Sequence, residues 1–81
     1  EYQVYGGIQL EDFNEELPLS LFSENYDTLS GYMIENLGYI PKENEQASVL
    51  EGEWQLRVEQ VKDNRIARVH VARRLGHVSE K

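Results

Sequence analysis

The sequence predicts a small α+β domain with two layers, in which two helices pack on one face of a mainly antiparallel sheet. The chain has 81 residues, which is enough for one domain and too short for two. Apolar residues recur at helical spacing in the first half of the chain and at alternate positions in the second half. We therefore expect one domain at residues 1–73, followed by a loose C-terminal tail at residues 74–81.

The first part of the chain predicts a short strand, a short helix and an apolar connector. Residues 2–5 are β-prone and precede two glycines, so we expect a strand that enters a turn. Residues 10–17 place apolar side chains on one helical face, and Pro18 is expected to end this helix because proline clashes with the preceding turn. The apolar positions of this helix are Leu10, Phe13 and Leu17. After this helix we expect an extended connector that packs three apolar side chains under the helices, those of Leu19, Leu21 and Phe22.

The second predicted helix, at about residues 28–37, has signals at both of its ends. The side chain of Asp27 or Thr28 can accept a hydrogen bond from a free N–H group of the first turn. Gly38 stands where a left-handed residue ends many helices, and Pro41 follows shortly after. The apolar stripe of this helix consists of Leu29, Tyr32, Met33 and Leu37.

After the second helix the apolar pattern changes to alternation, which predicts strands. One strand is expected at residues 46–50, with a turn at Glu51-Gly52. A second follows from residue 54, and Val61 breaks its alternation, which predicts a bulge or a strand end near Glu59–Gln60. Asp63-Asn64 tolerate positive φ and predict a tight hairpin into the last strand. The alternating apolar positions are Trp54, Leu56, Val58, Ala67, Val69 and Val71.

Composition excludes several classes of function. The formal net charge of −7 disfavours nucleic acid and anionic membrane surfaces as partners. Residues 1–53 carry one basic and twelve acidic side chains, whereas residues 54–81 carry seven basic and three acidic ones. We interpret this asymmetry as an acidic helical half packed on a basic strand half. A dipolar surface that steers a partner is the alternative.

The absence of cysteine excludes disulfide bonds, thiol nucleophiles and thiolate metal sites. No apolar run approaches the ~18–20 residues of a membrane span, so we expect no membrane insertion by this chain. No signal peptide is recognisable. Because position 1 is Glu, we expect the chain to be a piece of a longer protein.

Four short segments carry a resemblance to a known family. They are Gly7–Leu17 with its Phe13-Asn14-Glu15, then Tyr26-Asp27-Thr28-Leu29-Ser30-Gly31, Leu37-Gly38-Tyr39-Ile40-Pro41 and Arg65–Val71. In this order and spacing they resemble the CorC/HlyC transporter-associated domain, over roughly residues 2–73. The central pattern, Thr-Leu-x-Gly followed by Leu-Gly-x-Ile-Pro, is the most specific part of the resemblance.

The resemblance implies a non-catalytic C-terminal regulatory or interaction domain that modulates ion transport. The parent would be a magnesium/cobalt efflux protein or a hemolysin-like membrane protein, with the domain on the cytoplasmic side of the membrane. The expected partners are the CBS modules and the membrane domain of the parent chain, and a homodimer is the further possibility because small sheets have exposed edges. The fold would be similar to a small subdomain of FAD-binding oxidoreductases. Candidate contact residues are the tyrosines Tyr2, Tyr5, Tyr26 and Tyr39.

Two candidate sites follow from the residues themselves. The first is a possible divalent-cation site on the acidic face of the first helix, with ligands Glu11, Asp12, Glu15 and Glu16. The second is the start of the second helix, where a flavin or nucleotide phosphate could sit on Thr28, Ser30 and Gly31. For both we favour the simpler interpretation, a solvated helix face and an ordinary N-cap, since no ligand loop or Gly-rich GxGxxG motif accompanies them.

No cofactor and no enzymatic activity are expected. No acid–base pair and no Ser/His/Asp arrangement stands at recognisable spacing. His70 and His77 lack a second His or Cys at ligand spacing, so we expect both to be surface histidines.

Overall fold

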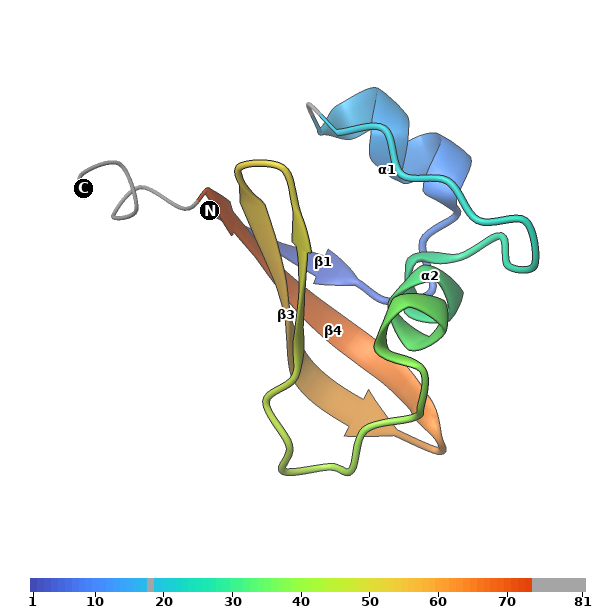
Figure 1. Ribbon diagram of the computed structural model, residues 1–81, viewed down its shortest axis with the longest axis vertical. Helices are drawn as coiled ribbons and strands as arrows, with labels where there is room; N and C mark the ends of the chain where they lie inside the picture. The colour runs from blue at the N-terminus through green and yellow to red at the C-terminus, as the bar shows by residue number, and fades with distance from the viewer. Residues whose placement is uncertain (18, 74–81) are drawn as a thin grey trace.

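The computed structural model describes residues 1–17 and 19–73 and confirms the predicted α+β fold (Figure 1). Its elements, in chain order, are β1 (Tyr2–Tyr5), α1 (Leu10–Glu16), α2 (Leu29–Leu37), β2 (Ser48–Glu51), β3 (Trp54–Lys62) and β4 (Arg65–Arg73). The strands form one antiparallel sheet in the order β1-β4-β3-β2. Figure 1 shows both helices on the same side of this sheet.

The sheet joins the two ends of the described chain. β1 pairs with β4 in a register that places Tyr2 opposite Val71 and Val4 opposite Val69. β3 and β4 form the long central hairpin, and β2 pairs with the outer side of β3. Strands β1 and β2 are therefore the two edges of the sheet.

The core lies between the helices and the sheet. Phe13 of α1 and Leu29 and Met33 of α2 are fully buried, and they meet the inward-facing side chains of the central strands. The fully buried side chains of those strands are Leu56, Ile66, Val69 and Val71. Burial of these apolar side chains on one face of each element is what holds the two layers together.

Helix α2 has the ends that its sequence predicts. Thr28 is the N-cap and accepts a hydrogen bond from the Gly31 N–H at 3.2 Å. Gly38 ends the helix in the left-handed conformation, with φ of 86°. The helix also reaches the edge of the sheet, because the Tyr32 hydroxyl donates to the Glu51 carboxylate of β2 at 2.6 Å. Burial and that carboxylate both raise the pKa of Tyr32.

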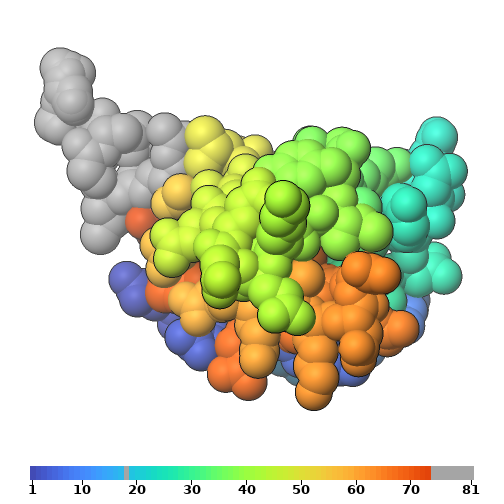
Figure 2. Space-filling model, turned by 90° about the horizontal axis from the view of Figure 1, so that it is seen from below, coloured from blue at the N-terminus to red at the C-terminus, as the bar shows by residue number. Residues whose placement is uncertain are grey.

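The predicted bulge and hairpin are both confirmed. The β3–β4 register shifts between Val58 and Val61, where the alternation of apolar residues breaks. Asp63 and Asn64 have φ of 54° and 61°, as a two-residue hairpin turn of this kind requires. Figure 2 shows this turn beside the loop that follows α2, at one end of the molecule.

Three expectations need correction. Phe22 is 75% exposed and not tucked under the helices. The reason is that the Asn14 side chain bonds both the N–H and the C=O of Leu21, which turns Leu21 inward and the next residue outward. The strand expected at residues 46–50 runs from 48 to 51, and the turn expected at Glu51-Gly52 lies one residue later, at Gly52-Glu53, with Gly52 at φ of 61°. His70, expected at the surface, has a side chain that is only 17% exposed because neighbours on the sheet cover it.

Three predictions lie outside the described residues: those on Pro18, on His77 and on the tail at 74–81.

Candidate functional site

The candidate phosphate site at the start of α2 is already occupied by protein acceptors. The first four N–H groups of a helix have no partner inside the helix and are the groups that bind anions. Three of them donate to protein oxygens: Leu29 to the Ile8 carbonyl at 3.0 Å, Ser30 to the Gly6 carbonyl at 2.8 Å and Gly31 to Thr28 Oγ1 at 3.2 Å. The first bond inside the helix then runs from the Tyr32 N–H to the Thr28 carbonyl at 2.9 Å. A phosphate at this position would have to displace these bonds.

The side chain of Ser30 is part of the framework of the domain. Its Oγ accepts the buried N–H of Ile66 at 3.0 Å, and the residue is 7% exposed. The bond ties the first turn of α2 to β4. Gly31 is equally constrained, since a Cβ there would lie 2.5 Å from the side chain of Tyr26, which rests against the helix.

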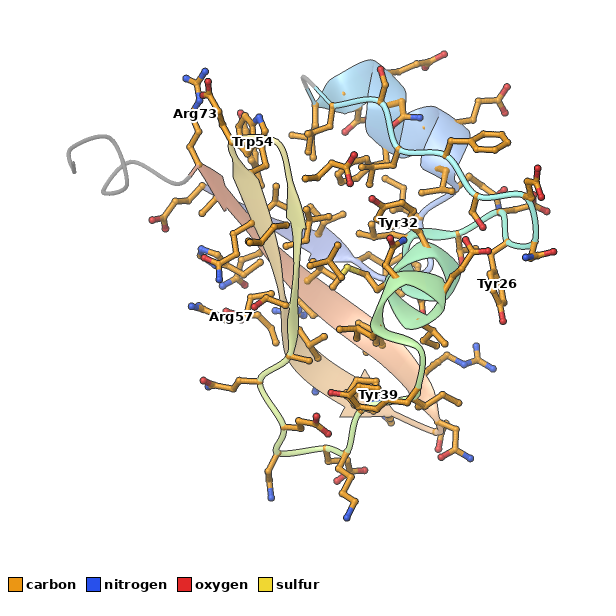
Figure 3. The ribbon with its side chains drawn as sticks, viewed as in Figure 1. Tyr26, Tyr32, Tyr39, Trp54, Arg57 and Arg73 are labelled. Carbon is orange, nitrogen blue, oxygen red and sulfur yellow. The ribbon has the colours of Figure 1, made fainter. Side chains whose placement is uncertain are left out.

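An open groove of about 740 Å³ lies beside this helix start. Its walls come from the turn after β1, the first turns of α2 and the tip of the β3–β4 hairpin. Tyr5 and Tyr26 line it and are 71% and 43% exposed, and Lys62 and Arg65 place two basic side chains at the hairpin wall. Tyr26 projects outward beside α2 in Figure 3. We call this surface the tyrosine groove.

The four tyrosines proposed as contact residues do not form a single patch. Tyr5 and Tyr26 share the tyrosine groove, whereas Tyr39 lies at another end of the molecule (Figure 3). The Tyr39 hydroxyl donates to the Glu45 carboxylate, which lowers the pKa of Glu45 and raises that of Tyr39. Tyr2 instead lies beside Trp54, with ring centroids 6.3 Å apart.

Trp54 is the centre of an aromatic and cationic cluster at the end of the sheet. The Arg73 guanidinium lies 5.6 Å from the centroid of the Trp54 ring, and it also faces the Glu53 carboxylate at 3.3 Å. Figure 3 shows Arg73 and Trp54 together at this end. The alternation of Trp54 with Leu56 and Val58 predicts an inward-facing side chain, and Trp54 is partly buried and packs against the core. Its partners come from β1 and β4, which local patterns do not bring together.

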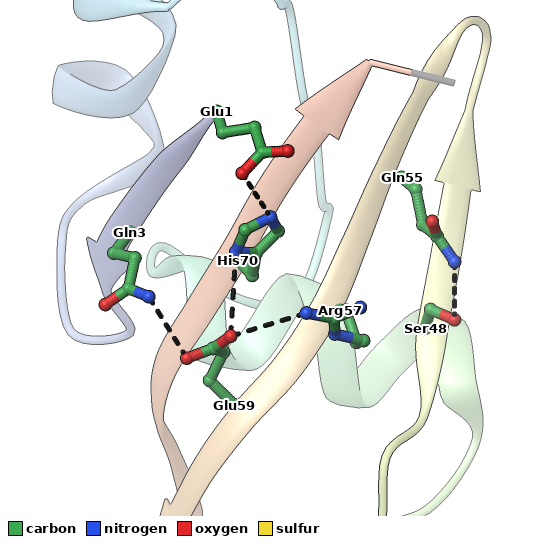
Figure 4. Close-up of polar contacts among 7 residues, drawn as sticks. All are labelled: Glu1, Gln3, Ser48, Gln55, Arg57, Glu59 and His70. Atoms are coloured by element: carbon green, nitrogen blue, oxygen red, sulfur yellow. Dashed lines mark hydrogen bonds and ion pairs between the residues drawn. The ribbon is translucent and has the colours of Figure 1, made fainter. Parts of the chain in front are cut away.

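A polar network covers the face of the sheet that looks away from the helices (Figure 4). Nε2 of His70 lies 3.5 Å from the Glu1 carboxylate, and Nδ1 lies 3.5 Å from the Glu59 carboxylate. Glu59 also contacts Arg57 at 3.5 Å and the Gln3 side chain at 3.3 Å. The network spans β1, β3 and β4, and its signal in the sequence is the polar alternate positions of the two long strands.

The acidic residues of α1 are exposed along the helix. Within residues 1–17 and 19–73, no group of three or more His, Cys, Asp or Glu side chains is arranged to hold a metal ion. Glu16 lines a second groove, beside β1, whereas Glu11 lies next to the connector between α1 and α2.

Comparison with known proteins identifies the family. The model of the CorC_HlyC transporter associated domain matches residues 1–74. This chain belongs to the CorC_HlyC family. A search of curated proteins returned no match. The family is one of transporter-associated domains, and in the described part of this CorC_HlyC domain neither helix is long and apolar enough to cross a membrane.

Solved structures of similar domains share the fold. A hemolysin domain from Enterococcus faecalis V583 is 33% identical, with a TM-score of 0.84 and coverage of 89% of this chain and 86% of that one. A Mg²⁺ and Co²⁺ transporter (CorC) associated region from Neisseria meningitidis MC58 is 28% identical, with a TM-score of 0.73 and coverage of 88% and 85%. The transporter associated domain of a Xylella fastidiosa Temecula1 hemolysin, in complex with Mg²⁺ and Mn²⁺, is 25% identical, with a TM-score of 0.72 and coverage of 88% and 84%.

Proposed function

We propose that this CorC_HlyC domain is a non-catalytic regulatory and interaction domain of a magnesium/cobalt transporter or a hemolysin-like membrane protein. The family match over residues 1–74 and the transporter and hemolysin names of similar domains support this context. In the proposal, the domain lies on the cytoplasmic side and docks on the CBS modules or the membrane domain of its parent chain.

The tyrosine groove is the observation that carries the interaction role. It exposes two aromatic rings, and residues that combine a large apolar ring with a polar end are favoured in protein contacts. The backbone behind it is held firmly, since the Gly6 N–H donates to the Ala67 carbonyl at 2.8 Å and Ser30 bonds Ile66. A rigid surface of this kind transmits a change in docking to its neighbour, which biases the membrane domain between states.

The test is ion transport by the parent protein with the tyrosine groove altered. Replacing both Tyr5 and Tyr26 with Ala is expected to change the dependence of Mg²⁺ and Co²⁺ flux on regulatory ligands several-fold, measured in vesicles with an ion-sensitive dye. The matched control is Tyr39→Ala, because Tyr39 is exposed to a similar extent, at 46%, but lies away from the groove. Equal transport by the wild type and the groove variant, with both folded, contradicts the proposal.

Divalent-cation sensing is the second candidate function, and one observation favours it. The Xylella fastidiosa domain is described in complex with Mg²⁺ and Mn²⁺. In this chain the corresponding candidate site is the acidic face of α1, formed by Glu11, Asp12, Glu15 and Glu16. Calorimetry with Mg²⁺, Mn²⁺ and Co²⁺ tests it, and the absence of saturable heat at millimolar metal removes it.

We do not propose flavin binding as a function of this domain. The N–H groups of Leu29, Ser30 and Gly31 already have protein acceptors, so a phosphate at the start of α2 would have to compete with these bonds. A shift of the melting temperature on addition of FAD would overturn this choice.

A further inference from the structure

Among residues 1–17 and 19–73, strand β1 presents backbone groups without a hydrogen-bond partner along one edge of the sheet. The Gly6 N–H bonds the Ala67 carbonyl of β4, and antiparallel ladders alternate between bonded and non-bonded residues. Tyr2 and Val4 therefore bond β4, and the N–H and C=O of Gln3 point away from it together with the N–H of Tyr5. The Tyr5 carbonyl is taken by the N–H of Ile8 at 3.1 Å.

This edge lacks the features that usually protect an edge strand. Natural sheets block their edges with charged side chains, proline or bulges. The β1 sequence is Tyr-Gln-Val-Tyr, with no charge and no proline, and its register against β4 is regular. The other edge strand, β2, carries Glu51, whose carboxylate is held by Tyr32. The two edges thus differ, and β1 is the one open to another strand.

A groove beside β1 suits the side chains of an added strand. It has a volume of about 270 Å³ and lies between β1 and α1. Its apolar walls are formed by Tyr2, Val4, Ile8, Phe13 and Leu17. Because side chains alternate along a strand, every second residue of a strand paired with β1 would enter this groove.

The charge beside the groove indicates which kind of partner binds there. Glu16 lines the groove, and the exposed face of α1 carries three further carboxylates nearby in the helix. If a second copy of the chain paired its own β1 in antiparallel fashion, both helix layers would share one face of the joined sheet. The two acidic α1 helices would then meet across the joint, which is unfavourable. A basic segment instead gains from the same carboxylates.

We propose that β1 binds an extended segment of a partner polypeptide by strand addition. The segment carries aliphatic side chains at alternate positions, which fill the groove beside α1, and a Lys or Arg that faces Glu16. Its backbone pairs with the outward N–H and C=O of Gln3 and with the N–H of Tyr5. This inference rests on the proposed interaction role and names a second surface and the chemistry of its partner.

The experiment selects short random peptides on the wild-type chain and maps their binding by amide hydrogen exchange. We expect the selected peptides to alternate aliphatic residues and to contain Lys or Arg, and the amides of Gln3 and Tyr5 to become protected when they bind. Gln3→Pro removes the outward N–H from an edge position where proline is tolerated, and is expected to weaken binding by about tenfold. Gln3→Ala keeps that N–H and is the matched control.

A second pair of variants tests the charge and does not alter β1. Glu16→Lys is expected to weaken the binding of the basic peptides several-fold, whereas Glu11→Lys, on the same helix but outside the groove, is expected to weaken it much less. This pair of variants tests the proposal even if Gln3→Pro disturbs the fold.

Five outcomes overturn the inference: no selected peptide, peptides without Lys or Arg, equal binding to Gln3→Pro, equal binding to Glu16→Lys, or self-association of the chain through β1. The peptide screen uses the chain by itself, and the tyrosine-groove test uses transport by the parent protein. Either proposal can therefore fail without the other.

Discussion

Ser30 shows how one small polar side chain can hold two layers of a domain together. Its hydroxyl accepts a buried backbone N–H from β4, and its own N–H donates to the Gly6 carbonyl. The residue that the sequence offered as a phosphate ligand is used for internal structure.

Replacing Ser30 with Ala tests this role. The change leaves the N–H of Ile66 buried without an acceptor, and such a loss costs about 1–3 kcal/mol of unfolding free energy. Urea denaturation measures it. Ser48→Ala is the control, because Ser48 makes a single exposed bond, from Gln55 at 3.3 Å, and should cost less than about 0.5 kcal/mol. Equal effects at the two serines would contradict the assignment.

At the scale of single elements, the β3–β4 hairpin depends on its two-residue turn. Both Asp63 and Asn64 have positive φ, which costs most L-residues about 1–2 kcal/mol. Asn64→Gly should therefore raise the unfolding free energy by several tenths of a kcal/mol, and Asn64→Val should lower it by about 1 kcal/mol or more. Thermal and urea unfolding of the two variants check this, and the same sign for both would refute it.

The connector before α2 is tied to the helix by a carboxylate. The Ser23 hydroxyl donates to the Glu35 carboxylate at 2.5 Å, and the Asn25 side-chain amide donates to the same carboxylate at 2.8 Å. These bonds lower the pKa of Glu35 below its ordinary 4.5. Because the pKa is lower in the folded state, the unfolded chain takes up its proton first as the pH falls. The stabilising effect of Glu35 is thus present above pH 4.5 and is lost as the pH falls through the lowered pKa.

We expect Glu35→Gln to reduce the loss of stability in this acidic range and to change the melting temperature mainly near neutral pH. Melting temperatures measured from pH 7 downward provide the test. Glu24→Gln serves as the control, since Glu24 lies in the same connector and makes no hydrogen bond to the described residues. A pH profile that is parallel to that of the wild type would show that the bonds to Glu35 do not contribute.

At the scale of the whole molecule, the fold is closed by pairing its first strand with its last. β1 covers the outer edge of β4, and Val4 packs against the core. Contacts between residues so distant in sequence form only when the rest of the sheet is in place. The turn that follows β1 also supplies the carbonyl that accepts the Ser30 N–H.

Deleting residues 1–5 should therefore destabilise the entire domain and not just one edge. We expect a loss on the order of 5 kcal/mol, comparable with the total stability of a small domain. The measurement is urea unfolding followed by circular dichroism, with Gln3→Ala as the control because it retains the β1 backbone. Retention of a cooperative transition at the wild-type midpoint would contradict this prediction.

Much of the local structure could be predicted because its causes are local. Thr28 and Gly38 bound α2 by satisfying or ending its backbone hydrogen bonds. Asp63 and Asn64 form a turn because of their own conformational freedom, and Val61 marks the bulge by breaking the alternation. The error at Phe22 arose because two hydrogen bonds from the Asn14 side chain of α1 set the orientation of Leu21 in the connector.

The amino-acid sequence by itself determined the helices, the hairpin, the family and the two-layer class, since each depends on residues that are close along the chain. Tertiary structure decided the strand order, the hydrogen bonds of the Leu29 and Ser30 N–H groups at the start of α2, the tyrosine groove and the open β1 edge. These depend on which distant segments meet, and that is settled by burial of the shared core and not by any local preference.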